Sequence, residues 1–217
     1  MQLKINKPRV SSEMKELSDL EVYYNSLEDD SPIEYIRLKN DDISGENYHQ
    51  MEFYNSIFEK CRMLNCDFSN TSFVDVVFLN CDFSNSTFIT AYFQRCEFIN
   101  CKCTGCNMSD STFKHCHLKE CVFSFSNLST SYLENVLFNQ CDMTEAALSE
   151  IRYKSWKAIG TKFVGTNFFH TRLLGFDFSE CELSEITISD TMEELKGAKI
   201  SPVQALEIAR MAGVEVI

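Results

Sequence analysis

Six residues between positions 101 and 117 are of the types that bind zinc. They lie close together in the chain: Cys101, Cys103, Cys106, His115, Cys116 and His117. Thiolate and imidazole groups are the usual ligands of structural zinc, and short spacings can bring them to one ion. Whether these side chains can meet depends on the elements that carry them. The surrounding pattern therefore decides between a metal site and a packed core.

A bulky side chain recurs at every fifth residue from Phe53 to Ile188. The series has 28 consecutive positions, and only Cys103 and Ala158 are not bulky. A helix repeats every 3.6 residues and a strand every 2, so neither produces a period of five. A chain that turns a corner after every five residues does produce it. Four such sides, each a short strand, close a square coil of about twenty residues.

The position two residues before each bulky residue is held almost throughout by Cys, Ser, Thr, Ala or Val. Ten of the eleven cysteines occupy this small inward position, and Cys103 occupies a bulky one. Cys101 and Cys106 then face inward from different sides, while His115 and His117 flank a corner and point outward. Free cysteine is commonly buried and behaves as a small hydrophobe. We therefore expect unreactive core thiols, no metal and no cofactor.

The register also predicts which side chains form the buried ladder. Its members are the aromatic and thiol side chains of Phe53, Phe58, Phe68, Phe73, Phe78, Phe83, Cys61, Cys81, Cys101, Cys121 and Cys141. Trp156 is a large residue at a small position, and Ala158 stands at the bulky position of the same repeat. The pair is typical of volume compensation in a filled core. A local bulge over residues 154–160 is the alternative interpretation.

Blocks such as Cys66-Asp67-Phe68-Ser69-Asn70 and Cys81-Asp82-Phe83-Ser84-Asn85 match the pattern A(D/N)LXX. In this respect the chain resembles the pentapeptide-repeat family over about two-thirds of its length. The resemblance implies an all-β solenoid, a right-handed quadrilateral parallel β-helix. The repeat would occupy residues 36–190, between an N-terminal cap over 1–35 and a C-terminal cap with a dimerisation helix over 191–217.

Charge is unevenly distributed over the four sides, which we name after their first bulky residues as the Phe53, Phe58, Met63 and Phe68 faces. The repeats carry 17 acidic and 11 basic residues between positions 51 and 190. The Phe68 face comprises residues 66–70 and every equivalent block twenty residues later, and it has four acidic residues and no Lys or Arg. We predict a docking face for a basic protein, with the acidic residues Asp67, Asp110, Glu145, Glu150, Glu185 and Asp190, of which Glu145 and Glu185 stand on its adjoining corner. An ordinary solvated surface is the alternative.

Both ends of the repeat carry helical signals. Met14, Leu17, Leu20, Tyr24 and Leu27 form one apolar stripe, which predicts a helix over residues 12–27 that ends before Pro32. Near the C-terminus, Ser201-Pro202-Val203-Gln204 combines an N-cap, a first-turn proline and a capping-box glutamine.

The C-terminal helix is apolar around most of its circumference. This apolar surface is wider than a single contact can cover. We predict a two-fold dimer through this end. Its interface would contain Val203, Leu206, Ile208, Met211, Val214 and Val216.

Composition excludes several classes of protein. The net charge of −12 argues against direct binding of nucleic acid. No apolar run suggests a secretion signal or a membrane span, so we expect a cytoplasmic protein. No inward polar triad, glycine-rich phosphate loop or HExxH motif is present, so we expect no enzyme.

The ending GAKISPVQALEIARMAGVEVI resembles the C-termini of Qnr-type quinolone-resistance proteins. These are bacterial pentapeptide-repeat dimers, and the resemblance implies binding to DNA gyrase and topoisomerase IV, with the rod standing in for duplex DNA. It also implies protection of those enzymes from fluoroquinolones. Some members carry loops between coils that matter for protection, and the unbroken register predicts none here. The alternative is a scaffold that binds another basic protein partner through the acidic face.

Overall fold

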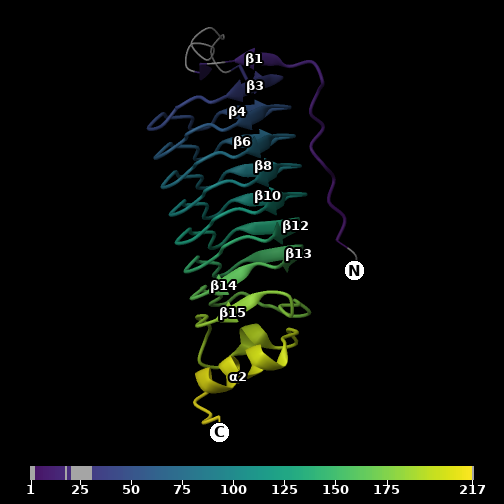
Figure 1. Ribbon diagram of the computed structural model, residues 1–217, viewed down its shortest axis with the longest axis vertical. Coiled ribbons are helices and arrows are strands. Elements are labelled where there is room, and N and C mark those ends of the chain that lie inside the picture. The colour runs from purple at the N-terminus through teal and green to yellow at the C-terminus, as the bar shows by residue number, and fades with distance from the viewer. Residues whose placement is uncertain (1–2, 18, 21–30, 217) are drawn as a thin grey trace.

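Short parallel strands stack along one axis and form a β-solenoid of about eight turns, followed by one C-terminal helix (Figure 1). The computed structural model describes residues 3–17, 19–20 and 31–216. The Phe53 face carries β2 (Ile33–Glu34), β4 (Glu52–Tyr54), β6 (Ser72–Val74), β8 (Tyr92–Gln94) and β10 (Thr112–Lys114). The Phe58 face carries β1 (Lys15–Leu17), β3 (Ile36–Lys39), β5 (Ile57–Glu59), β7 (Val77–Leu79), β9 (Glu97–Ile99) and β11 (His117–Lys119). Two longer strands, β12 (Tyr132–Asn139) and β13 (Arg152–Ile159), continue across both faces.

The register between neighbouring turns is twenty residues. Phe53 pairs with Phe73, which pairs with Phe93. The Met63 and Phe68 faces have the same spacing, through single bridges such as that between Asp67 and Thr87, and the Met63 face adds β14 (Lys162–Val164) and β15 (Glu182–Ser184). The expected four-sided parallel β-solenoid is confirmed.

Aromatic rings fill the axis of the solenoid. Phe53, Phe73, Phe93 and Phe113 form one column, with ring centroids 4.7–5.1 Å apart and interplanar angles of 6–12°. Rings of adjacent faces meet edge to face, as Phe73 and Phe78 do at 5.5 Å. Such pairs add about 0.5–1.5 kcal/mol to the burial of their apolar area. All eleven residues of the expected ladder are at most 2 % exposed.

The small inward residues share one hydrogen bond, which explains why Cys, Ser and Thr replace one another. The Thr71 hydroxyl donates to the carbonyl oxygen of Tyr48 at 2.7 Å, and the Cys96 thiol donates to that of Phe73 at 3.3 Å. In both pairs the acceptor is the bulky residue 23 positions earlier. Each turn is thereby tied to the turn before it by its side chains as well as its backbone.

The last residue of each repeat turns the corner with a positive φ. Every fifth residue from Tyr35 to Glu150 has a φ between 46° and 83°. Asparagine and glycine tolerate this conformation best, and Asn, Gly and Asp hold many of these corners. At Gly105 a Cβ atom would lie 2.6 Å from the Asn85 side-chain oxygen, so a larger residue there would require the Asn85 side chain to move.

The regular pattern changes at β13. Leu133 pairs with Tyr153 and Val136 with Trp156, but Glu134 pairs with Ser155, which marks a β-bulge. Trp156 and Ala158 both face inward, at 5 % and 7 % exposure. The local bulge is therefore confirmed, and the small Ala158 offsets only part of the volume of the Trp156 indole.

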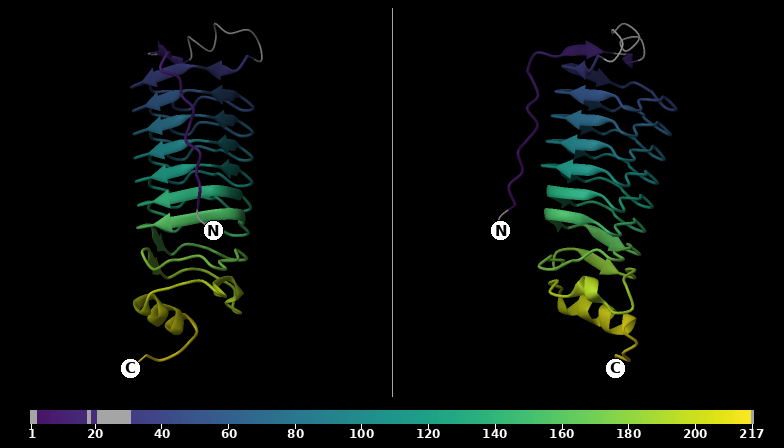
Figure 2. Two further views of the ribbon diagram at one scale, coloured as in Figure 1. Left: turned by 90° about the vertical axis from the view of Figure 1, so that its right-hand side faces the viewer. Right: turned by 180° about the vertical axis from the view of Figure 1, so that it is seen from behind.

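The N-terminal segment runs as an extended strap along the outside of the solenoid (Figure 2). It lies against the corner between the Phe53 and Phe58 faces, where Lys15 N–H donates to Tyr35 O at 2.8 Å and Arg9 N–H donates to Asp75 Oδ1 at 2.9 Å. Farther along the strap, Asn6 lies 3.4–3.5 Å from the two ring nitrogens of His115.

The helix predicted over residues 12–27 is wrong at Lys15–Leu17, because β1 adds a parallel strand beside β3 there. Tyr24 and Leu27 lie outside the described residues.

The C-terminal end closes the solenoid with two helical elements. After a 3-10 turn, η1 (Glu193–Leu195), the chain forms α2 (Pro202–Met211). Ser201 and Gln204 make the predicted capping box. The buried Gln204 side chain also donates to the carbonyl oxygens of Phe178 and Cys181, at 2.9 and 2.7 Å, and thereby attaches the helix to the last turn.

Candidate functional site

The acidic residues predicted as a docking site lie on the Phe68 face and its two corners. Asp110, Glu150 and Asp190 are exposed and follow one another in the same corner column, two turns apart. Glu145 and Glu185 are exposed in the opposite corner column, and Asp67 lies half-buried in the middle of the face. The structure thus places all six on one side of the rod, but spread along its length. The outward side chains between them are mostly Ser, Thr, Asn and Ala.

The spacing of these carboxylates sets the strength of their field. Two turns correspond to about 10 Å at the usual separation of parallel strands. That distance is comparable to the Debye length of about 8 Å at physiological ionic strength, so each carboxylate acts largely alone. Hydrogen bonding from the Ser69 side chain, and from Ser69 N–H at 2.8 Å, holds the pKa of Asp67 below its usual value. Asp110 accepts a hydrogen bond from the Thr130 hydroxyl at 2.8 Å. A basic partner would have to touch this face to gain from it.

Large apolar side chains border the acidic residues, and the charge pattern of the sequence does not reveal them. Phe125 is 59 % exposed at the corner preceding Glu145 in the same column, and its φ of 61° is unusual for a bulky residue. Ile89 and Phe169 are 36 % and 39 % exposed on the face itself. Phe125 could have been recognised from the sequence, because it is the only phenylalanine at the last position of a repeat within 51–190.

The N-terminal strap leaves this face uncovered. Its contacts at Tyr35, Asp75 and His115 fall on the corner between the Phe53 and Phe58 faces. In a four-sided coil this corner is diagonally opposite the one that joins the Met63 and Phe68 faces. The strap is anchored by Asp75, whose carboxylate also accepts two hydrogen bonds from Arg95, at 2.6 and 2.7 Å. Sequence patterns that operate within one repeat could not reveal a contact between residues 9 and 75.

The residues predicted for the dimer interface are mostly exposed in the single chain. Val203, Leu206, Met211, Val214 and Val216 are 37–72 % exposed on or after α2. Ile208 differs, because it packs against the hydrophobic core of its own chain. One side of the helix therefore covers the last turn, and the other side presents an apolar surface to solvent.

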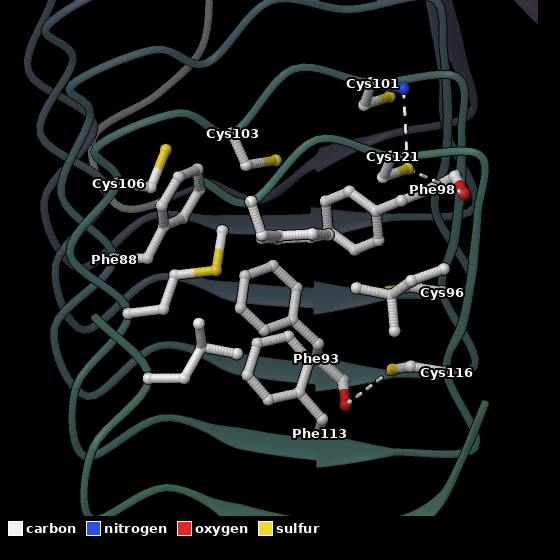
Figure 3. Close-up of a cluster of buried hydrophobic side chains, with 14 of the residues drawn as sticks. Phe88, Phe93, Cys96, Phe98, Cys101, Cys103, Cys106, Phe113, Cys116 and Cys121 are labelled. Carbon is white, nitrogen blue, oxygen red and sulfur yellow. Dashed lines mark hydrogen bonds between the residues drawn. The ribbon is translucent and has the colours of Figure 1, made fainter. Parts of the chain in front are cut away.

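The cysteine and histidine residues that resemble a zinc site do not converge on one point. Cys101, Cys103 and Cys106 are buried and point into the solenoid from separate places along its wall (Figure 3). Burial raises the pKa of the Cys101 and Cys103 thiols well above the usual value, which disfavours the thiolate that a metal requires. Among the described residues, no three His, Cys, Asp or Glu side chains are grouped so that they could hold a metal ion. All eleven cysteines are free.

His117 is the least expected member of this group. It lies on β11, half-buried, and its Nε2 atom is buried with no hydrogen-bond partner. Burial lowers the pKa of His117, so the ring favours its neutral form. His115, by contrast, is a corner residue in contact with Asn6 of the strap. The two histidines thus lie where the strap crosses the solenoid.

No helix in the described part of the chain has both the length and the apolar character needed to cross a bilayer. No curated protein matches the chain. Among solved structures, a trypsin-treated form of QnrB1, described as a plasmid-mediated fluoroquinolone resistance protein, is 19 % identical, covers 86 % of this chain and 100 % of its own, and gives a TM-score of 0.40. Full-length QnrB1 is 18 % identical, with coverages of 81 % and 99 % and a TM-score of 0.37.

HetL of the cyanobacterium Nostoc, described as involved in heterocyst differentiation regulation, is 10 % identical, with coverages of 83 % and 90 % and a TM-score of 0.21. Because these TM-scores are below 0.5, the structural similarities give no evidence beyond that of the repeat itself. Two family descriptions match the chain directly: "Pentapeptide repeats (8 copies)" over residues 52–88 and "Pentapeptide repeat region" over residues 91–157. Together with the period of five and the four-sided solenoid, these matches show that the chain belongs to the pentapeptide-repeat proteins.

Proposed function

We propose that this chain is a non-enzymatic rod that binds DNA gyrase and topoisomerase IV through its Phe68 face, standing in for duplex DNA, and protects these enzymes from fluoroquinolones. The observation that carries the proposal is the face itself, which has carboxylates, no Lys or Arg, and no covering by the N-terminal strap. The resemblance of residues 197–217 to the C-termini of Qnr-type proteins supports the choice of partner.

The active unit in this proposal is a cytoplasmic homodimer joined through α2. The exposed apolar residues of α2 and the tail after it support this arrangement, because five large apolar side chains are exposed within fourteen residues of sequence. A two-fold dimer through this end would double the length of the rod and repeat the Phe68 face on each half.

The density of charge limits the likeness to DNA. The rod has seven turns between residues 51 and 190, about 34 Å at the usual strand separation, and B-DNA carries roughly 20 charges over that length. The Phe68 face carries four acidic residues. This difference favours recognition by shape and contact over long-range attraction, and it also favours the second candidate function, a scaffold for a different basic protein.

A supercoiling assay with purified gyrase tests the proposal. We expect micromolar rod protein to change supercoiling activity or its inhibition by ciprofloxacin, and added salt to weaken the effect. The variant Asp110→Lys, Glu150→Lys should lose it. The control Glu97→Lys, Glu120→Lys changes net charge equally on the Phe58 face and should retain it.

Absence of any effect on gyrase or topoisomerase IV at micromolar protein would refute the proposal. Equal loss in both double variants would show that net charge, and not the Phe68 face, is recognised. Capture of another basic protein that depends on Asp110 and Glu150 would instead support the scaffold.

A further inference from the structure

The backbone ladder of the solenoid opens below β13. In the turns above, two hydrogen bonds recur on the Phe53 and Phe58 faces, such as Asp75 N–H to Gln94 O at 2.9 Å and Val77 N–H to Ser56 O at 3.0 Å. Within the described part of the chain, no equivalent of either bond joins β13 to residues 171–180.

Hydrogen bonds at the two ends of β13 still join this strand to the next turn, and just before β13 Ile151 N–H donates to the Thr171 hydroxyl oxygen at 2.9 Å. Gly160 N–H donates to Glu180 O at 3.1 Å, and the Tyr153 hydroxyl donates to Arg172 O at 2.5 Å. Both lie near the ends of β13, so the stretch between them is left open.

The opening has a cause in the sequence. Trp156 occupies the inward position that Cys116 and Val136 hold in the two preceding turns, and Phe176 follows it in the next. The ring centroids of Trp156 and Phe176 lie 4.4 Å apart. An indole is far larger than a thiol or an isopropyl group. In a closely packed core the extra side-chain volume displaces the backbone. The bulge in β13 is the local result, because Ser155 shifts its pairing and does not adopt the positive φ of the earlier corners.

A cavity of about 600 Å³ lies at this opening. Its walls include the rings of Trp156 and Phe176, the aliphatic side chains of Ile159 and Leu174, and the ammonium groups of Lys157 and Lys199. This size and this mixture of apolar walls with a few polar groups are typical of sites for small molecules.

Trp156, one of the residues that line this cavity, carries an unpaired donor. Its indole N–H is buried and has no hydrogen-bond partner among the residues that the structure describes. A buried tryptophan N–H usually finds an acceptor, and an unpaired buried donor costs free energy. An unsatisfied group therefore points to an occupant that supplies the missing acceptor.

We propose that the cavity below β13 binds a small planar apolar molecule that carries a carbonyl or carboxylate oxygen. The ring of this ligand stacks among Trp156 and Phe176, and its oxygen accepts the Trp156 N–H. Acidic side chains also line the cavity, including Asp177, whose carboxylate is held by Ser179. Because charges of both signs are present, neutral carbonyl and anionic carboxylate ligands share the required chemistry.

The chain has one tryptophan, so its ¹H–¹⁵N spectrum contains one indole signal that reports directly on this site. The probes are benzoate, benzamide and toluene, which present a carboxylate, a carbonyl and no acceptor on the same ring. We expect the indole proton to move downfield with benzoate or benzamide, and either to bind about tenfold more tightly than toluene. Binding by only one of the two would identify which oxygen the site prefers.

Two variants separate a specific site from nonspecific apolar binding. Ile159→Arg places a long side chain in the cavity wall and should abolish binding, whereas Ile89→Arg, an equally exposed isoleucine on the Phe68 face, should not. Trp156→Phe keeps a ring but removes the donor, so calorimetry should show benzoate and benzamide binding no better than toluene. The proposal is overturned if the indole signal is unchanged at roughly 5 mM of each probe, if toluene binds equally well, or if Ile159→Arg and Ile89→Arg behave alike.

Discussion

Replacing Asp75 by asparagine should loosen the N-terminal strap and destabilise the solenoid. Asparagine suits the exchange because it tolerates the φ of 58° at this corner, so the backbone is spared and the loss is electrostatic. The carboxylate receives two hydrogen bonds from Arg95 and one from Arg9 N–H. The side chains of Asp75 and Arg95 are 8 % and 17 % exposed, so water cannot fully replace the lost partner.

The magnitude follows from this burial. Removing one partner of a fully buried ion pair costs about 3–5 kcal/mol, and the remaining exposure of Arg95 reduces the expected loss to about 2–3 kcal/mol of unfolding free energy. The strap loses a hydrogen bond to a charged acceptor and keeps one to a neutral oxygen, a difference of about 1 kcal/mol. The detached strap should therefore become about five times more populated.

Urea unfolding measures the first effect and limited trypsin digestion the second, because Lys4 and Arg9 are cleavage sites within the strap. Glu134→Gln is the matched control. It removes a pair with Lys154, which is 64 % exposed, and should cost far less stability than Asp75→Asn without changing strap cleavage. Equal unfolding midpoints for the two variants, or equal rates of strap cleavage, would refute the reasoning.

The same pair predicts a pH dependence. Burial alone would raise the pKa of Asp75, but the hydrogen bonds from Arg95 and Arg9 outweigh it and hold the pKa below its usual value. The stabilisation is therefore present above the unfolded-state pKa of about 3.9 and is lost as the pH falls through the folded-state value. Wild-type protein should lose more stability than Asp75→Asn on acidification below about pH 5.

Two further predictions concern the helix and the thiols. Leu206→Glu places a charge on the exposed apolar surface of α2, so light scattering should show monomers where the wild type is dimeric, and a wild-type monomer would contradict the proposed interface. A thiol reagent such as DTNB should label about one cysteine per native chain, Cys181, and all eleven after denaturation, because the other ten are buried; rapid labelling of several native thiols would contradict the packed ladder.

The period of five was sufficient to predict the repeat, the inward ladder and a Phe68 face that has carboxylates but no Lys or Arg, because each depends only on the position of a residue within its own turn. Phe93 and Cys101 are buried where the register places them. The register also places Cys101 and Cys106 on different inner faces, which argues against a zinc ion shared by them.

Features that depend on contacts outside the register could not be predicted in this way. Leu17 and Leu20 fit a helical stripe, yet Lys15–Leu17 forms β1, because the first turn would otherwise leave the backbone groups of β3 without a partner. Ile208 is predicted as a dimer-interface residue, yet it packs against the core of its own chain. The sequence of α2 could not reveal this, because the position of the last turn decides which side of the helix is covered. The docking of Arg9 on Asp75 likewise requires the three-dimensional path of the strap.

The opened ladder below β13 also determines how the rod comes apart. In a solenoid each turn contacts only its neighbours, so stability is nearly a sum of nearest-neighbour terms along one dimension. The weakest junction then divides the chain into two cooperative blocks, one ending with the turn of β13 and β14 and one containing β15 and α2. Amide protons on the two sides should exchange with different free energies. Under a pulling force the turns would separate first at the junction below β13. The bulge at Trp156 would therefore set the point at which the C-terminal end detaches from the long repeat.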